Sequence, residues 1–577
     1  MSNQDHTTDS ALPEATRPTW LIPAGFVLLL LQGLRTIGHA DFWTHLAAGQ
    51  AGLSRMDPLT WVSYDQTWVH VHHLYDRTLA LLFGLGGAPL LTLLHVLATL
   101  GAFGLLVRVI RPQANPASIA LSLCLSVWLL APRFEVRPET LALLFAALFI
   151  FVLSKDSTSW RLWGLLLPVQ VIWANTDTSF IWGPFMALLF AIQAYWGPPR
   201  NLRTFALVLP HLGLVVALLL VSLINPHFTE VYRASLHTLA APVLRDWISP
   251  LSGLFPSALT RNLITLALII GAIGLLTRRE RLPLALTALA MISAFLAVRA
   301  AMAYLSWFAL FAFPFFCLSL DALHKLLQRK SSLYQAHGHR LWAITVALVV
   351  VISGALLVSN RYYTHAGHYA TFGLGIADQG TAKGALRHVV HAPGFPESFL
   401  NLPMDGGYLA YHRPGQRAYI DQRGEVHGSH TYRRLLNGLL GDADAWDAIQ
   451  ARDNPQAILL NHAWLYAIDT LRFLHQQGEW RWIYFDGVSS VLVRNHPDHA
   501  ALLDRTEEFR QLGLQELATH QQTHLARLGG VQRPPVSPAL VGASLVFRAR
   551  GLTEKADYCQ SLVSAGAPNL DWSLLVR

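Results

Sequence analysis

Two side chains near the start of the chain have the spacing of a reactive pair. Asp41 and His45 lie in the segment Gly38-His-Ala-Asp-Phe-Trp-Thr-His45. On a helix, residues four apart share one face, so the carboxylate and the imidazole would lie one turn apart. Such a pair could bind a divalent ion or take a proton from an attacking hydroxyl. Asp41 could equally be a helix N-cap, and periodicity alone leaves both interpretations open.

A run of imidazoles follows in the same region. The segment Trp68-Val-His-Val-His-His73 contains His72 and His73, and neutral imidazole is a frequent metal ligand. With Asp41, His45 and His72 as candidate ligands, a divalent metal is possible. However, neither an HExxH nor a CxxC spacing accompanies the run, and histidines beside aromatic residues often only anchor a chain at the membrane interface. Trp68, His72 and His73 are therefore candidate substrate-binding residues, with metal binding left unknown.

Arg133, Arg137 and Arg299 stand at the ends of apolar stretches. A guanidinium group can clamp a phosphate through two parallel hydrogen bonds, so these arginines are candidates for binding a phosphate group. The alternative is that they reach out to lipid headgroups. Polar residues at other span ends are candidate substrate-binding residues, because ionisable and amide groups at membrane depth are costly; they are Asn175, Asp177, Asn225 and Asp246.

The composition indicates which elements must position these residues. Of the 577 residues, 53% are apolar and only 14% are charged, whereas soluble globular proteins contain about 25% charged residues. Apolar stretches of roughly 15–24 residues are long enough to span or nearly span a membrane. We predict eleven transmembrane helices, near residues 20–36, 88–109, 117–132, 138–154, 162–175, 180–196, 204–224, 262–276, 282–298, 301–320 and 341–358.

The charge distribution predicts the orientation of these helices. Residues 1–359 contain 23 Lys/Arg against 15 Asp/Glu, whereas residues 360–577 contain 20 of each. The basic excess lies in alternate short loops, and basic short loops stay cytoplasmic. The net charge of +8 is therefore a topology signal and gives no reason to expect nucleic acid. This places the N-terminus inside and puts every candidate site residue on the outer face.

The predicted organisation has four parts. A cytoplasmic leader (residues 1–19) precedes a transmembrane domain (20–359) with two long outer loops, 37–87 and 225–261. The segment Thr78–Leu85 is too short to span and reads as a helix in the interface. Residues 360–497 alternate short β-rich runs and helical stretches, which is typical of a small α/β domain. Residues 498–577 form a helical tail.

Five strands and two helices are expected within the α/β domain. Strands are predicted at Tyr408–His412, Ala418–Asp421, Ala457–Leu460, Trp482–Phe485 and Ser490–Arg494, and helices at 431–452 and 462–477. Three cysteines give no disulfide framework.

Several short motifs, in order, resemble a bacterial group of GT-C-type glycosyltransferases. The first outer loop has Asp41-Phe-Trp-Thr-His-Leu-Ala-Ala-Gly49, Met56-Asp-Pro-Leu-Thr-Trp61 and Trp68 to Leu74. Later segments of the chain are similar to further motifs of the group; they are Val136-Arg-Pro-Glu139, Trp173-Ala-Asn-Thr-Asp-Thr-Ser-Phe180, Ile224-Asn-Pro226, Arg245-Asp-Trp247, Gly406-Gly-Tyr408 and Tyr419-Ile-Asp-Gln-Arg423. Three departures stand out: Asp177 replaces a histidine, Asp246 replaces a glutamate, and Trp68 to His73 replaces W-x-N-H-E-W.

This resemblance implies a polyprenyl-phosphate-linked sugar donor presented from the outer leaflet. It also implies that the acidic residue of the first outer loop, here Asp41, lies at the catalytic centre as base or metal ligand. The expected activity is an inverting glycosyl transfer at the outer face of the bacterial plasma membrane. The C-terminal part, residues 360–577, would then lie outside, where it could contact envelope-assembly partners.

Two other classes of function are open on the sequence. A transporter or flippase for lipid-linked precursors would also use many spans, although we find no inverted repeat of the kind that transporters often contain. A non-catalytic scaffold of envelope assembly is the second alternative. The identities of sugar and acceptor do not follow from the residues.

Overall fold

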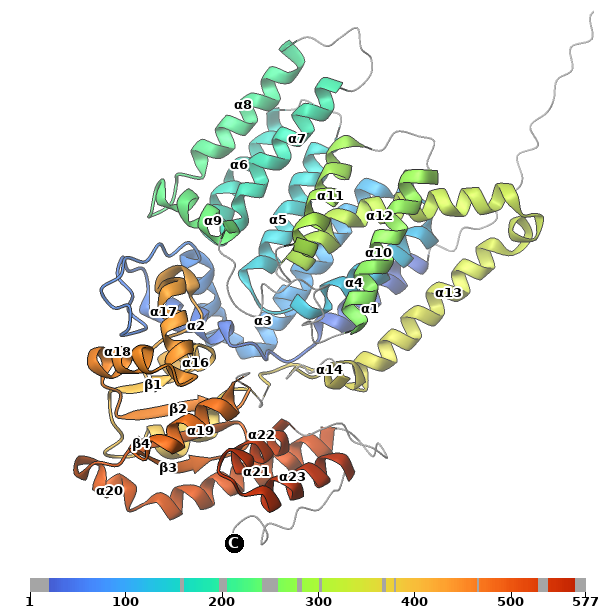
Figure 1. Ribbon diagram of the computed structural model, residues 1–577. Helices are drawn as coiled ribbons and strands as arrows, with labels where there is room; N and C mark the ends of the chain where they lie inside the picture. Colours follow the sequence, from blue (N-terminus) through green and yellow to red (C-terminus); the bar gives the residue numbers. More distant parts are fainter. Residues whose placement is uncertain are drawn as a thin grey trace, which may run out of the picture.

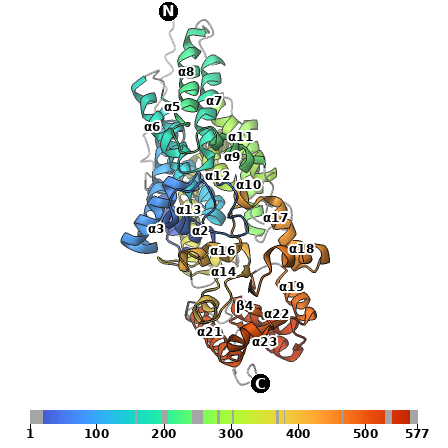
Figure 2. The same ribbon diagram turned by 90° about the vertical axis from the view of Figure 1, so that its left-hand side faces the viewer.

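The protein is a bundle of helices joined to a smaller part built on a sheet (Figure 1). The computed structural model describes residues 20–155, 160–196, 205–240, 258–277, 283–299, 304–365, 370–377, 380–463, 466–527 and 538–565. Seen from the side, the molecule is elongated, with α8 at one end and α21–α23 at the other (Figure 2).

The bundle consists of long apolar helices. They are α1 (Leu21–Gly33), α3 (His73–Ile110), α4 (Pro116–Leu130), α5 (Pro138–Leu153), α6 (Trp160–Ala174), α7 (Trp182–Trp196), α8 (Phe205–Val221), α10 (Ala258–Thr277), α11 (Leu284–Arg299), α12 (Leu305–Lys330) and α13 (Ser332–Val358). Each of the eleven predicted spans falls on one of these helices. Among the described residues, five helical stretches are long and apolar enough to cross a membrane. The protein is thus a multi-pass membrane protein, and the count of eleven crossings stays a prediction.

Short helices lie at the boundary of the bundle. The helix α2 (Asp41–Ala51) follows α1, and the 3-10 helix η1 (Ala131–Arg133) closes α4. Three further short helices are η2 (Thr178–Ile181), α9 (Glu230–Ala240) and α14 (Arg361–His365). Thr78–Leu85 is helical as expected, but it lies in the first part of α3, which kinks at Gly87, whose φ of 61° is left-handed. Glycine adopts this conformation without steric cost, so the chain turns there.

The second part contains a four-stranded mixed sheet of order β1-β2-β4-β3. Strand β1 (Phe399–Asn401) is parallel to β2 (Ala457–Asn461), whereas β4 (Ser489–Arg494) is antiparallel to both β2 and β3 (Trp480–Phe485). The helices around it are α15 (Lys383–Ala385), η6 (Leu386–Val390), α16 (Pro403–His412), α17 (Gly424–Leu439), α18 (Ala443–Asp453), α19 (Ala467–Gln477), η7 (Pro497–His499), α20 (Ala500–Leu503), α21 (Thr506–Arg527), α22 (Pro538–Ala549) and α23 (Thr553–Ala565).

Two of the predicted strands are wrong. Tyr408–His412 belongs to α16, which begins at Pro403; a five-residue apolar run fits a helix as well as a strand, and proline at a first helical position favours the helix. Ala418–Asp421 is an extended segment with a single bridge, between Thr60 and Ala418. The short strand β1 was not predicted, and the predicted helix 431–452 is two helices, because the chain turns at Gly441 with a φ of 91°.

The strand β2 is buried at every position because both faces of the sheet are covered. Successive residues of a strand point to opposite sides, and here they enter two different cores. Ala457 and Leu459 pack in a core that also contains Phe42 and Leu46 of α2. Ile458 and Leu460 pack in a second core with helices α17 to α19. One core of the sheet therefore extends into the first predicted outer loop.

Candidate functional site

The helix α2 carries the predicted pair. Asp41 is its first residue, and the residue before it, Ala40, occupies the N-cap position without a side-chain cap. The N-cap interpretation of Asp41 is therefore wrong. Asp41 and His45 lie one turn apart and line a cavity of about 170 Å³, together with Thr44, Ala48, Trp68, His72, Asp76, Gln422, Arg423 and Glu425. The cavity thus lies between the outer-loop region and the sheet-containing part.

The Asp41 carboxylate is ion-paired. Its Oδ2 lies 3.0 Å from a terminal nitrogen of Arg137. Arg137 in turn donates from Nε to Glu135 Oε2 at 2.8 Å, and the other oxygen of Glu135 accepts from Arg35 at 2.8 Å. Burial, the largest single effect, raises the pKa of Asp41, but the charges of Arg137, His39, His45 and Arg133 together outweigh it, so the net shift is downward. Asp41 is therefore ionised at neutral pH, and it shares Arg137 with a second acid.

The His45 imidazole is hydrogen-bonded through Nδ1 to a second aspartate, Asp76. His45 Nδ1 lies 2.7 Å from Asp76 Oδ1, and His70 Nε2 lies 2.7 Å from Asp76 Oδ2. Burial lowers the pKa of His45, but the charge of Asp76 and its hydrogen bond raise it, and the net shift is upward. Because Nδ1 is engaged, a proton exchanged with a substrate would pass through Nε2. Asp76 is thus a site residue that sequence analysis missed, although its spacing from His72 could have indicated it.

The other predicted imidazoles have separate contacts. His72 lines the cavity, its ring centroid lies 5.5 Å from that of His45, and its Nδ1 donates to the carbonyl oxygen of Thr176 at 2.8 Å. His73 Nδ1 donates to the carbonyl oxygen of His70 at 3.1 Å. Among the described residues, no group of three or more His, Cys, Asp or Glu side chains is arranged to hold a metal ion. A metal requirement stays open.

Trp68 is buried in a stack of charged and aromatic groups. Its ring lies 3.8 Å from that of His70 and carries the Arg423 guanidinium 4.6 Å above its centroid. With an exposed fraction of 4%, Trp68 forms a wall of the cavity.

A buried charge network joins the loop between α2 and α3 to the sheet-containing part. Arg423 donates to Asp57 Oδ1 at 2.6 Å and also bonds both carboxylate oxygens of Asp421. His427 Nε2 lies 2.9 Å from Asp421, and its Nδ1 lies 2.9 Å from Ser63 Oγ. Two motifs of the resemblance, Asp-Pro in the loop and Ile-Asp-Gln-Arg beyond the bundle, are thus in direct contact.

The remaining predicted residues lie away from the cavity lining. Arg133 bonds Glu139 at 3.1 Å, and Asp177 caps η2 through the backbone nitrogen of Ser179 at 2.8 Å. Asn175 donates to the carbonyl oxygens of Val171 and Ile224, and Asn225 accepts from the backbone nitrogen of His227. Arg299 ends α11, its side chain lies outside the described part, and Asp246 lies outside the described residues altogether.

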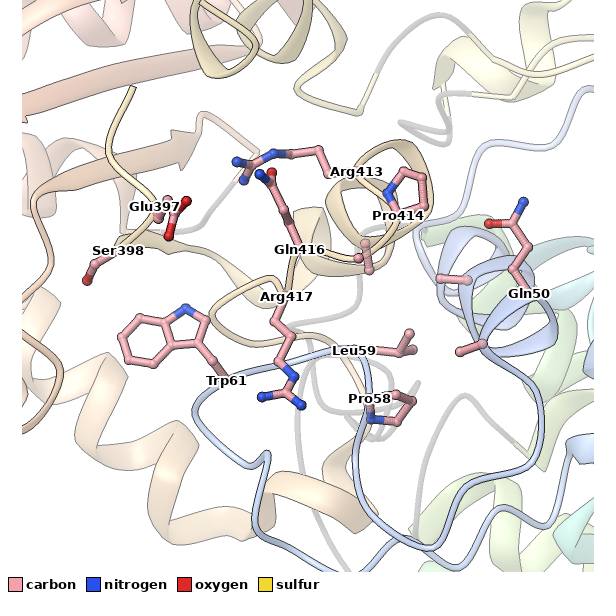
Figure 3. A pocket seen from close by; sticks show the side chains of 14 residues that line it. Gln50, Pro58, Leu59, Trp61, Glu397, Ser398, Arg413, Pro414, Gln416 and Arg417 are labelled. Carbon is pink, nitrogen blue, oxygen red and sulfur yellow. The ribbon is translucent and has the colours of Figure 1, made fainter. Parts of the chain in front are cut away.

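A larger cavity of about 770 Å³ lies at the other end of α2. Figure 3 shows its lining, in which Arg413, Gln416 and Glu397 lie on one side and Trp61, Arg417 and Pro58 on the other. The lining comes from four segments, namely the end of α2, the loop near Leu59, the residues just before β1, and the end of α16 with the turn that follows it. No prediction from the sequence pointed to this cavity.

The chain has a fold similar to that of solved oligosaccharyltransferase structures. No protein-family model matches the chain, and no curated protein matches its sequence. Among solved structures, it is similar to the archaeal oligosaccharyltransferase AglB from Archaeoglobus fulgidus in complex with an inhibitory peptide and a dolichol-phosphate. The TM-score is 0.50 and the identity 11%, and the match covers 81% of this chain and 73% of that one. The apo form of the Archaeoglobus fulgidus oligosaccharyltransferase matches with a TM-score of 0.50 and 11% identity over 84% of this chain and 75% of its own.

A further match has a lower score. It is ArnT from Cupriavidus metallidurans bound to undecaprenyl phosphate, with a TM-score of 0.44 and 14% identity over 83% of this chain and 98% of that one.

Proposed function

We propose that this protein is an inverting glycosyltransferase of the bacterial plasma membrane. It would take a sugar from a polyprenyl-phosphate donor and transfer it to an acceptor on the outer face. The observation that carries the proposal is the convergence of Asp41, backed by Arg137, and His45, backed by Asp76, on one cavity in a GT-C-type fold. The dolichol-phosphate in the structure of AglB supports a lipid phosphate as the leaving group.

The reaction needs one proton acceptor and one group that stabilises phosphate charge. The acceptor oxygen attacks the anomeric carbon of the donor, its proton passes to Asp41, and the bond from that carbon to the phosphate oxygen breaks with its electrons remaining on the lipid phosphate. Attack opposite the departing oxygen inverts the configuration. His45, hydrogen-bonded to Asp76, lies one turn from Asp41, which supports a role for it in orienting the acceptor hydroxyl.

Arg137 would act on both the proton acceptor, Asp41, and the departing phosphate. In the structure its charge lowers the pKa of Asp41, which makes that carboxylate a weak base. A donor phosphate that bound Arg137 would compete with Asp41 for the guanidinium, because phosphate is a strong bidentate acceptor. The pKa of Asp41 would then rise towards its ordinary value. Donor binding would thus activate the base and prepare Arg137 to stabilise the departing phosphate.

The outward position of the site is supported by the loop charges, which place the first loop and residues 360–577 on the same side of the membrane. The contact of Asp57 with Arg423 requires that these two segments share one side. The donor would reach the cavity from the outer leaflet.

The test is a transfer assay on the full chain in proteoliposomes that contain a radiolabelled polyprenyl-phosphate sugar, scored separately for donor cleavage and for translocation. We expect Asp41→Asn to reduce cleavage by about 10²-fold or more, the range for loss of a general base. Asp65→Asn is the matched control, because Asp65 is an exposed carboxylate of the same loop. Translocation without cleavage would identify a transporter, and cleavage that survives Asp41→Asn would remove Asp41 from the mechanism.

A further inference from the structure

The 770 Å³ cavity lies on the same helix as the proposed catalytic cavity. Thr44, His45 and Ala48 of α2 line the smaller cavity, whereas Ala47, Gln50 and Ala51 line the larger one. A small apolar cluster formed by Ala47, Ala48, Leu59, Trp68, Ala410 and Val426 packs at this part of α2. The nine helical steps from Asp41 to Gln50 correspond to about 14 Å along a helix axis.

Two arginines in the larger cavity, Arg413 and Arg417, form no salt bridge within the described residues, although Glu397 acts electrostatically on Arg413. The Arg413 guanidinium lies 5.1 Å from the ring centroid of Phe399, and the Arg417 guanidinium lies 5.5 Å from that of Tyr64. Within the part of the chain that the structure describes, no carboxylate oxygen lies within 4.0 Å of either group. Glu397 is the single acid in the lining, so the cavity has an excess of positive charge and two planar groups able to receive anions.

The rest of the lining is suited to hydroxyl groups. Gln50 and Gln416 provide exposed amides, which donate and accept hydrogen bonds. Trp61, half-buried, provides an aromatic surface on the side opposite Arg413 (Figure 3). The volume lies in the range of about 300–1,000 Å³ typical of small-molecule sites. A ligand that matches all of these groups has many hydroxyls, an apolar ring face and at least one anionic group.

We propose that this cavity binds an acidic oligosaccharide, the part of the acceptor remote from the reacting hydroxyl. The proposal rests on the proposed function, since only a transferase requires an acceptor. Arg413 and Arg417 would pair with carboxylate or phosphate groups of the saccharide, and the acceptor would extend along α2 towards Asp41. Binding energy from a remote part of a substrate can be used to position its reacting end.

The experiment measures binding by calorimetry on the full chain in nanodiscs, without any donor. The probes are trigalacturonate, a phosphorylated maltotriose, neutral maltotriose, inorganic phosphate and an acidic peptide. We expect the wild type to bind one or both anionic saccharides, and the relative affinities to tell carboxylate from phosphate. Arg413→Gln/Arg417→Gln should weaken this binding at least ten-fold. Arg472→Gln is the control, because Arg472 is half-exposed on α19.

Several outcomes would overturn the assignment. These are no binding of either anionic saccharide, equal affinity in the double variant, or equal loss in Arg472→Gln. Tighter binding of the peptide, or equal binding of phosphate alone, would reject the saccharide class. Asp41→Asn should bind as the wild type does. Saccharide binding without any transfer would reject the proposed function only, whereas transfer without saccharide binding would reject the cavity assignment only.

Discussion

The two ionisable groups of α2 are controlled by partners of opposite charge. Arg137 lowers the pKa of Asp41, and Asp76 raises that of His45, so the carboxylate is charged and the imidazole tends to be protonated. His39, buried beside Glu135 with a ring nitrogen 3.9 Å from its carboxylate, behaves differently: burial lowers its pKa to about 4, so it is neutral. Charged neighbours thus set the protonation states of Asp41 and His45, whereas burial sets that of His39.

Asp76→Asn should shift the pH dependence of transfer. Because the negative charge of Asp76 raises the pKa of His45, its removal lowers that pKa, and any limb of the pH–rate profile that reports His45 moves to lower pH. The profile of kcat/KM measured between pH 5 and 9 (about the range in which imidazole titrates) checks this. Asp65→Asn should leave the limb where it is. An unmoved limb in Asp76→Asn would show that His45 does not titrate in the reaction.

At the scale of elements, the site depends on the close approach of α16 to α2. Gly407 faces α2 so closely that a Cβ there would overlap the backbone nitrogen and the side chain of Thr44. Gly406 similarly faces the carbonyl oxygen of Ile420. The Trp43 ring of α2 packs on Tyr408 of α16 at 5.0 Å. Glycine at these two positions allows α16 to pack directly against α2 and against the segment that contains Ile420.

Gly407→Ala should therefore destabilise the packing of α16 on α2. Overpacking of this kind costs about 1–3 kcal/mol, and the added methyl group meets backbone, which cannot rotate away. Thermal unfolding followed by tryptophan fluorescence should show the loss. Gly104→Ala is the control, because Gly104 lies in α3 with open space around its Cα. Equal stability of the two variants would contradict the proposed close packing.

At the scale of the whole molecule, the bundle and the sheet-containing part are joined by a shared core and by buried charge. Asp57 has an exposed fraction of 1% and Asp421 of 0%, and both are neutralised by Arg423. Burial raises the pKa of Asp421, but Arg423 and His427 outweigh it and the net shift is downward. Its contribution to stability is therefore complete above the unfolded pKa of about 3.9 and is lost as the pH falls towards the folded value.

Arg423→Gln should open the junction, because it leaves two buried carboxylates without their cation. Breaking a buried pair in this way costs about 3–5 kcal/mol. Hydrogen exchange should increase in residues 55–68 and 419–427 while the exchange of α12 stays slow. The double variant Asp57→Asn/Arg423→Gln should recover part of the loss, and Arg472→Gln should change little. Unchanged exchange in Arg423→Gln would show that the shared apolar core alone holds the junction.

Much of the secondary structure could be predicted from the sequence, but little of the site. The strands predicted at Ala457–Leu460, Trp482–Phe485 and Ser490–Arg494 are confirmed as parts of β2, β3 and β4, because their β-branched and aromatic runs are bounded by turn residues. Tyr408–His412 was wrong because a short apolar run does not distinguish a strand from a helix. The single bridge from Thr60 to Ala418 depends on a partner segment distant in the chain.

The amino-acid sequence by itself determined that this is a membrane protein with many helices, and that one pair of site side chains lies together. The length of the apolar runs required helices that cross a membrane, and the four-residue spacing placed Asp41 and His45 on one helical face. Only the tertiary structure decided which groups complete the site. Arg137 reaches Asp41 from the loop before α5, Asp76 reaches His45 from the start of α3, and Arg423 reaches Asp57 across 366 residues. Periodicity encodes local geometry, whereas such contacts arise from the packing of distant segments, which no spacing along the chain specifies.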